Sequence, residues 1–338
     1  MHGSGGACRG VEISLFPPRI GLNVPWLGGA YGHDLGRNRA HPDWPVWYNC
    51  TELNQILDLV QAFGIRLLRI WLFENGEGLQ ENAQIGGVDE LFLRNLDELV
   101  GNLGQRGLEV YWTLLDANSV LPQWDSVTLS ILTGAATETF CEHALAVVLP
   151  IIRPVTWAID LCNEPEGIIA GRCGNRTRSG LGWSEVRPAL RLLRNCIAAH
   201  TPGIRVSVSS GWQIHEHVAR GLYHRQGFEP DFFDFHLYTE DGAVPAGLAL
   251  KLSRPVVLGE LGGILEDRER SSRSAWNKAQ EATARSLDAL TGTRYEAAFL
   301  WFLSAPGEPD ASALVYAGEP GLALLRLQEL VQAKLLRV

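Results

Sequence analysis

The sequence lacks the features that mark membrane, secreted and disulfide-bonded proteins. It has no apolar run of membrane-spanning length, and residues 1–9 lack the continuous apolar core of a signal peptide. Its six cysteines include no C-x-x-C pair and are few for 338 residues, which favours reduced thiols over a disulfide scaffold. We therefore expect a cytoplasmic protein, or a secreted one if a leader has been removed, with no membrane partner.

Basic residues and the usual cofactor motifs are also scarce. Lys and Arg number 29 against 38 Asp and Glu, a net charge of −9, and no basic run suggests a nucleic-acid partner. There is no His-Glu-x-x-His run, and the pair His215 and His217 diverges if it lies on a helix. Gly28-Gly29 and Gly262-Gly263 do not match a phosphate-binding fingerprint. We expect no metal and no nucleotide or flavin cofactor; the oligomeric state stays open.

The chain is, by contrast, rich in tryptophan and in apolar segments. It has 11 Trp beside 7 Tyr, and hydrophobic residues make up 46% of the chain. Trp rings stack well on the apolar faces of sugars, so the composition suggests a carbohydrate ligand.

Eight apolar, β-rich segments recur along the chain. Most are continuous rather than alternating, as in parallel strands buried on both faces, and amphipathic segments separate several of them. This pattern predicts an α/β fold, a single (β/α)8 TIM barrel with long βα loops. Residues 1–338 would form one catalytic domain, with 1–18 as an N-terminal extension. The expected strands are Arg19 to Val24, Ile65 to Phe73, Leu108 to Leu115, Val155 to Cys162, Ile204 to Ser209, Phe232 to Tyr238, Pro255 to Gly259 and Glu296 to Leu303.

Helical periodicity is clearest between the first three of these strands. Asn49 or Thr51 can cap a first helix that ends at Gly64, and a second apolar face runs from Val88 to Leu103. Further helices are expected at 183–200, 271–290 and 322–335, with an abbreviated one at 243–252. The long loops after the strands fall on the face where barrel enzymes keep their active sites.

Two strands each deliver one carboxylate to that face. The strand 157–162 runs into Asn163-Glu164-Pro165, and the strand 255–259 runs into Glu260. Proline ends strand pairing just where Glu164 emerges. The fourth and seventh strands of an eight-stranded barrel lie across its mouth, so the two glutamates can face one ligand. Asp160, inside the fourth strand, is expected to balance a buried partner.

With these motifs the chain resembles the clan A glycoside hydrolases, especially the cellulase family, glycoside hydrolase family 5. The resemblance covers nearly the whole barrel and implies a retaining mechanism, with Glu164 as acid/base and Glu260 as nucleophile about 5–5.5 Å apart. The matching residues, in strand order, are Arg69, Asn163, Glu164, His236, Tyr238, Glu260 and Trp301.

The resemblance also implies roles for the supporting residues. Arg69 and Tyr238 would donate to Glu260 and hold it ionised. Asn163 would bind the sugar 2-hydroxyl, His236 would orient the polar network, and Trp301 would form the floor under the sugar. Each also has a structural interpretation, since a buried Arg is often a core ion pair and a Trp is usually packing.

The chain departs from the family at the end of the third strand. Family members commonly have a His there, whereas this chain has Asp116 and Asn118, either of which could substitute. The segment after the first strand offers further hydroxyl-reading candidates to the cleft, namely Trp26, Tyr31, His33 and Asp34. The departure at the third strand weakens any expectation of cellulose as the substrate.

Three functional hypotheses follow. The first is a retaining β-glycosidase that acts on a small β-linked oligosaccharide or glycoside. The second is an endo-acting β-mannanase or β-glucanase, which needs an open groove. The third is a catalytically silent barrel that binds carbohydrate, and the presence of both glutamates with their helpers argues against it.

Overall fold

The computed structural model describes eleven segments of the chain. They are residues 17–27, 32–38, 42–80, 86–117, 126–168, 181–211, 228–245, 254–264, 272–303, 313–316 and 319–338. Of the expected N-terminal extension only Pro17 and Pro18 are described, and their carbonyl oxygens accept bonds from Arg337 at 2.6 and 3.0 Å. Among the described helices, none is both long and apolar enough to span a membrane.

Eight parallel strands form one sheet, in the order β5-β4-β3-β2-β1-β8-β7-β6. The sheet closes between its two end strands, where the Asp231 amide donates to the Val206 carbonyl at 2.8 Å and the His236 amide to the Ser210 carbonyl at 2.9 Å. The fold is therefore the expected (β/α)8 barrel, and all eight expected strands are confirmed. The strands are β1 (Arg19–Asn23), β2 (Leu67–Trp71), β3 (Glu109–Thr113), β4 (Thr156–Asp160), β5 (Arg205–Ser207), β6 (Phe233–Thr239), β7 (Val256–Gly263) and β8 (Ala297–Leu300).

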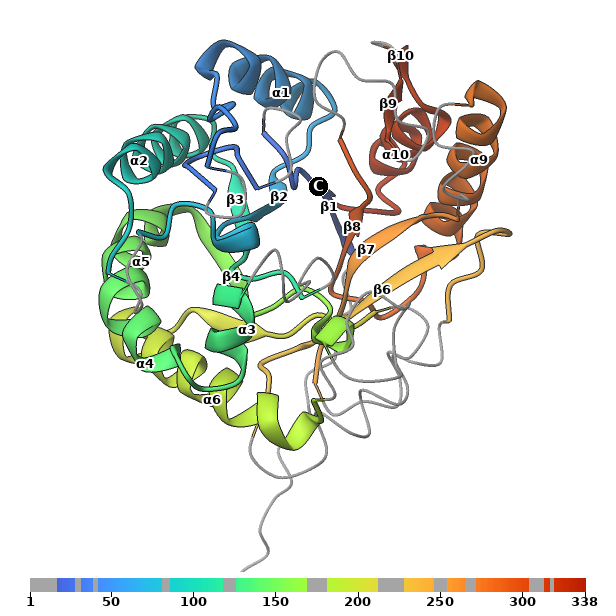
Figure 1. The fold of residues 1–338 in the computed structure, drawn as a ribbon. Helices are drawn as coiled ribbons and strands as arrows, with labels where there is room; N and C mark the ends of the chain where they lie inside the picture. The colour runs from blue at the N-terminus through green and yellow to red at the C-terminus, as the bar shows by residue number, and fades with distance from the viewer. Residues whose placement is uncertain are drawn as a thin grey trace, which may run out of the picture.

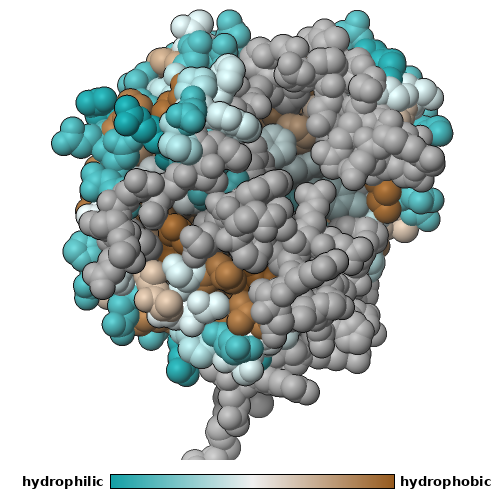
Figure 2. Space-filling view, viewed as in Figure 1, coloured by the Kyte–Doolittle hydropathy of each residue, from teal (hydrophilic) through white to brown (hydrophobic). Residues whose placement is uncertain are grey.

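Helices surround the strands (Figure 1). The longer ones are α1 (Cys50–Ala62), α2 (Glu90–Gln105), α6 (Trp183–His200), α9 (Arg273–Leu290) and α10 (Leu322–Gln332). Shorter ones are α3 (Ser126–Leu132), α4 (Thr137–Phe140), a π-helical turn (Cys141–Leu145) and α5 (Ala146–Ile152), and a small antiparallel pair, β9 (Val315–Tyr316) and β10 (Glu319–Pro320), precedes α10. The outer surface over α1 and α2 is mostly hydrophilic (Figure 2), as expected for amphipathic helices on a barrel.

The expected helices agree with the structure to within a few residues. Asn49, rather than Thr51, caps α1, because its side-chain oxygen accepts from the Thr51 amide at 2.9 Å. For the abbreviated helix expected at 243–252, residues 243–245 are not helical and the others lie outside the described residues. His215 and His217 also lie outside them.

The barrel interior is layered, which determines where polar side chains can lie. Alternate residues of a strand point inward. The lower layer is an apolar cluster of Leu67, Tyr111, Ala158, Phe232, Val257, Ala297 and Phe299. Gly21 is needed beside this layer, because a Cβ there would lie 2.7 Å from the Phe299 ring. Two residues further along β2 and β4, the inward positions are Arg69 and Asp160, both completely buried. The apolar floor thus supports an ionic layer at the C-terminal mouth.

Candidate active site

Arg69 is the centre of the ionic layer. Its Nη1 atom donates to Glu260 at 2.8 Å and to the Asn23 side chain at 3.1 Å. Its Nη2 atom donates to Asp160 at 2.9 Å and to the Asn163 side-chain oxygen at 2.8 Å. Burial alone lowers the pKa of Arg69, but the Glu260 and Asp160 charges outweigh it and raise the pKa. Arg69 is therefore a permanent cation that joins β1, β2, β4 and β7.

Glu260 is held on both oxygens. Arg69 donates to Oε1, and the Tyr238 hydroxyl donates to Oε2 at 2.5 Å. Burial raises the pKa of Glu260 above its ordinary value, while the charges of His236 and Arg69 oppose that shift. Both neighbours favour the ionised carboxylate, so the site holds one anion in a fixed orientation at the end of β7.

Glu164 leaves β4 in an unusual backbone conformation. Its φ of 42° lies in the left-handed region, which is uncommon for a non-glycine residue and persists only where the surroundings impose it. The Glu164 amide donates to the Ser209 hydroxyl at 3.3 Å, and its carbonyl accepts from the Gly167 amide at 2.9 Å. Strand β4 and the turn that starts at Pro165 thus direct the carboxyl group into the barrel mouth.

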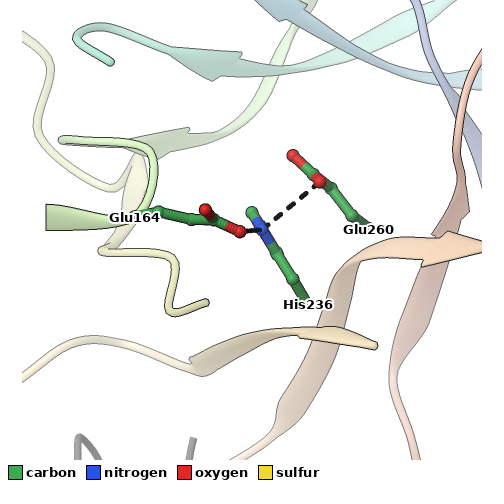
Figure 3. Close-up of side chains that lie close together, drawn as sticks. All are labelled: Glu164, His236 and Glu260. Carbon is green, nitrogen blue, oxygen red and sulfur yellow. Dashed lines mark hydrogen bonds and ion pairs between the residues drawn. The ribbon is translucent and has the colours of Figure 1, made fainter. Parts of the chain in front are cut away.

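His236 connects the two glutamates (Figure 3). Its Nδ1 atom lies 2.6 Å from Glu164 Oε1 and 3.4 Å from Glu260 Oε2. Burial is the largest influence and lowers the pKa of His236, but the Glu260 charge and the hydrogen bond to Glu164 together raise it to about 9. His236 is therefore mainly a cation at neutral pH, in contact with both carboxylates. The sequence suggested only that it orients the network near Tyr238.

The two glutamates are close together. One oxygen of each, with a nitrogen of His236, lies within a set of atoms that are all within 4.8 Å of one another. An inverting glycosidase needs room for a water between its carboxyl groups, which are then about 6.5–9.5 Å apart, whereas a retaining enzyme needs about 5–5.5 Å. The short separation suits direct attack by one carboxylate while the other handles the proton.

The same three residues have the composition of a metal site. Within the described part of the chain, Glu164, His236 and Glu260 are the one cluster with this geometry. The His236 nitrogen already contacts an oxygen of each glutamate, and Glu260 also accepts from Arg69 and Tyr238. Two strong donors, one of them a fixed cation, therefore compete with any metal for the same oxygens. The hydrogen-bond pattern therefore favours an ion-paired carboxylate pair over a metal site.

An aromatic wall lies next to the glutamates. The rings of Trp26, Trp71 and Trp301 form a near-equilateral triangle with centroid distances of 6.1 to 6.5 Å. Trp301 also contacts the Tyr238 ring at 6.5 Å, edge to face. Trp26 and Trp301 remain partly exposed, so they can offer ring surface to a sugar, whereas Trp71 is almost buried.

The structure places most of the expected binding residues in this mouth. Arg69, expected among the substrate-binding residues and as a donor to Glu260, has no exposed surface and donates to Glu260 and Asp160. Asp116 accepts from the Asn163 amide at 2.9 Å, so it orients Asn163 from the position where family members have a His. His33 is fully buried against the Trp44 ring. Tyr31 and Asn118 lie outside the described residues.

Asp34, Glu74 and Asp116 form a buried acidic group, and sequence reasoning missed this grouping. The centre of this group is Glu74, just after β2, whose Oε2 accepts from the Trp26 indole at 3.3 Å. Burial, then the charges of Asp116 and Asp34, raise the pKa of Glu74 well above its ordinary value. A carboxylate at the C-terminal end of a barrel strand was a usable signal, but nothing local to Glu74 indicated its neighbours.

Ser209 and Glu166 were also missed. Ser209, beyond the end of β5, contacts the Glu164 amide and donates to the Cys162 carbonyl at 3.3 Å. Glu166 is buried and accepts from the Ser210 hydroxyl at 2.7 Å; burial raises its pKa to about 7. Both support the turn that carries Glu164.

Comparisons with known proteins agree on the architecture. No protein-family model matches the sequence, and none of the curated proteins matches it. Solved structures do match. A β-mannanase from the blue mussel Mytilus edulis is 17% identical with a TM-score of 0.64, over 93% of this chain and 91% of that one. A β-1,4-mannanase from the sea hare Aplysia kurodai is 19% identical with a TM-score of 0.63, over 93% and 92%. An exo-β-1,4-mannosidase from Opitutaceae bacterium strain TAV5 is 20% identical with a TM-score of 0.65, over 94% and 60%. At these identities the likeness shows the barrel fold.

Proposed function

We propose that this chain is a retaining β-glycosidase of the glycoside hydrolase family 5 type, acting on a small β-linked oligosaccharide or glycoside. The observation that carries the proposal is the Glu164–Glu260 pair, whose oxygens approach within 4.8 Å at the barrel mouth. Its unequal surroundings support two different roles. Glu260 accepts from Arg69 and Tyr238, and Glu164 pairs with His236.

The geometry supports a double displacement. Glu260, oriented by Arg69 and Tyr238, attacks the anomeric carbon and forms a covalent glycosyl-enzyme. The Glu164–His236 pair supplies a proton to the departing oxygen through Glu164. Glu164 then takes a proton from water, which attacks the same carbon from the side the leaving group vacated. Two inversions give net retention of configuration.

Mannose is the first sugar to test. The similar structures include β-mannanases and an exo-β-1,4-mannosidase, and a protein named GH5_18 from Streptomyces cattleya was solved with Manβ1-4GlcNAc bound. The aromatic wall and the buried acidic group beside it, at the ends of β8, β1, β2 and β3, suit recognition of a sugar ring and its hydroxyls. The proposed substrate is therefore a short β-mannoside.

An endo-acting β-mannanase is the second candidate, since four of the similar structures are described as β-mannanases, one of them as an endo-1,4-β-mannanase. A time course on β-1,4-mannohexaose distinguishes the two. Release of one terminal sugar or disaccharide at a time supports the short-substrate enzyme, and early products of mixed length support endo action.

The decisive experiment is a panel of aryl β-glycosides, namely mannoside, glucoside, galactoside and fucoside, with the Glu260→Gln variant as control. We expect turnover of the mannoside with retention of configuration, and at least 10³-fold less with the variant, since removal of one catalytic carboxylate costs several kcal/mol of transition-state stabilisation. Binding of manno-oligosaccharides without turnover of any substrate would instead indicate a silent carbohydrate-binding barrel.

A further inference from the structure

Two cysteines and a histidine meet on the outer helical layer, away from the barrel mouth. They lie where α6 packs on the π-helical turn Cys141–Leu145. The Cys196 Sγ atom donates to the Cys141 carbonyl oxygen at 3.9 Å. The Nδ1 atom of His200, one helical turn after Cys196, lies 3.7 Å from that sulfur and 3.0 Å from the Cys196 carbonyl oxygen. All three residues are on elements that contribute nothing to the candidate active site.

The π-helical turn places Cys141 against α6. An extra residue in one turn widens the helix locally, and such turns recur at functional positions. Here the turn starts at Cys141 and faces α6 near its C-terminal end, where Cys196 is four residues before the last residue, His200. Packing between the two elements therefore holds the Cys196 sulfur against the Cys141 residue.

The two thiols are not equivalent. Cys196 is partly exposed, while Cys141 is buried, with 8% of its surface accessible. The hydrogen bond from Cys141, followed by the His200 charge, lowers the pKa of Cys196 to about 7 against the opposing effect of burial. The same hydrogen bond, burial and the nearby carboxylates of Glu142 and Glu138 raise the pKa of Cys141. One thiol is thus accessible and readily ionised, and its neighbour is protected and protonated.

We propose that Cys196 and Cys141 form a thiol modification site for low-molecular-weight disulfides, with Cys196 as the attacking thiol and Cys141 as the resolving thiol. The contact of the Cys196 sulfur with the Cys141 backbone, the partial exposure of Cys196 and the adjacent imidazole carry this assignment. Attack requires a thiolate that solvent can reach, and resolution requires a second thiol within bonding reach.

The reaction balances in two exchanges. The Cys196 thiolate attacks one sulfur of the small disulfide, forms a mixed disulfide and expels one small thiolate. Cys141 then loses its proton to solvent and attacks the Cys196 sulfur, which expels the second small thiolate. The protein loses two thiols and gains the Cys141–Cys196 bond, while the small disulfide is reduced to two thiols.

The first test is a labelling rate, with Cys50 as the matched control. Cys50 is also partly exposed, but a hydrogen bond with Glu98 raises its pKa. Native protein is treated with monobromobimane at pH 7, and the labelled cysteines are identified by peptide mass spectrometry. The larger thiolate fraction of Cys196, partly offset by its lower intrinsic nucleophilicity, predicts labelling about tenfold faster than Cys50. Equal or slower labelling of Cys196 overturns the proposal.

The second test identifies the product formed with glutathione disulfide. The wild-type protein should yield a linked peptide pair containing Cys141 and Cys196. Cys141→Ser should stop at a glutathione adduct on Cys196, and Cys196→Ser should leave residue 141 unmodified. His200→Gln should slow the labelling of Cys196 in a protein whose unfolding temperature is otherwise close to that of the wild type. A stable adduct on wild-type Cys196, or linkage of Cys196 to any other cysteine, contradicts the assigned resolving role.

Discussion

The Nδ1 atom of His236 lies 2.6 Å from Oε1 of Glu164, and the same nitrogen lies 3.4 Å from Oε2 of Glu260. One imidazole therefore contacts both carboxyl groups of the candidate site. Because His236 is completely buried, its charge is compensated only by its neighbours. Glu164 and His236 consequently behave as one coupled pair that keeps or loses a proton together, and the pair rather than either residue sets the apparent pKa.

This coupling predicts a bell-shaped dependence of kcat/KM on pH. On the acid side, activity requires ionised Glu260, and burial raises the pKa of that group, so the acid limb should lie above the ordinary glutamate value of about 4.3. On the alkaline side, activity requires the proton of the Glu164–His236 pair, and the pKa of His236 is raised to about 9. The limb should fall near that pH.

His236→Asn provides the control for the alkaline limb. Without the imidazole, Glu164 alone must hold the proton, and a carboxyl group loses it at lower pH than the pair does. The alkaline limb should move down by more than one pH unit, and the acid limb should move up, because the His236 charge no longer opposes the raised pKa of Glu260. An alkaline limb that does not move would show that a group other than the Glu164–His236 pair sets it.

The two glutamates should be separable by chemical rescue. With an activated aryl glycoside, which needs little protonation, Glu164→Ala should still glycosylate Glu260 but turn over slowly until azide replaces the base-assisted water. Its product should be a β-glycosyl azide. Glu260→Gly should give an α-configured product with azide, because only one displacement occurs. Nuclear magnetic resonance of the products gives the configuration, and the reverse outcome would exchange the two assignments.

Asn163 and Trp301 should affect different kinetic parameters. Asn163 accepts from Arg69 and donates to Asp116, which leaves one amide hydrogen for a sugar hydroxyl. If that bond strengthens in the transition state, Asn163→Ala should lower kcat about 10²- to 10³-fold with little change in KM. Trp301→Ala should raise KM as well as lower kcat, because ring stacking acts on the ground state too. Steady-state kinetics on one aryl glycoside tests both, and a pure KM effect at Asn163 would contradict its role.

Arg69 should be a stability residue as well as a positioning residue. Arg69→Met leaves Glu260 and Asp160 buried without their cation, and breaking such a pair costs about 3–5 kcal/mol. Arg254→Met is the matched control, because Arg254 pairs with Glu229 at the surface, where such a pair is worth about 1 kcal/mol or less. Thermal or urea unfolding measures the two losses, and losses of similar size would contradict the central place of Arg69.

The positions of the strands and helices were determined by the sequence itself. Burial on both faces makes a strand continuously apolar, and amphipathic spacing marks a helix, so local composition predicted all eight strands and the boundaries of α6. Glu164 and Glu260 were also predictable, because a carboxylate at the end of an apolar strand emerges at the barrel mouth.

Only the tertiary structure decided which side chains meet across the barrel. The bonds from Arg69 to β1, β4 and β7, and the contact of His236 with Glu164, join residues between 46 and 191 positions apart. The complete burial of His33 and the raised pKa of Glu74, which burial and then the charges of Asp116 and Asp34 cause, depend in the same way on neighbours from other segments. Such distances and desolvation arise from barrel closure and from side-chain packing, and no local pattern of residues encodes them.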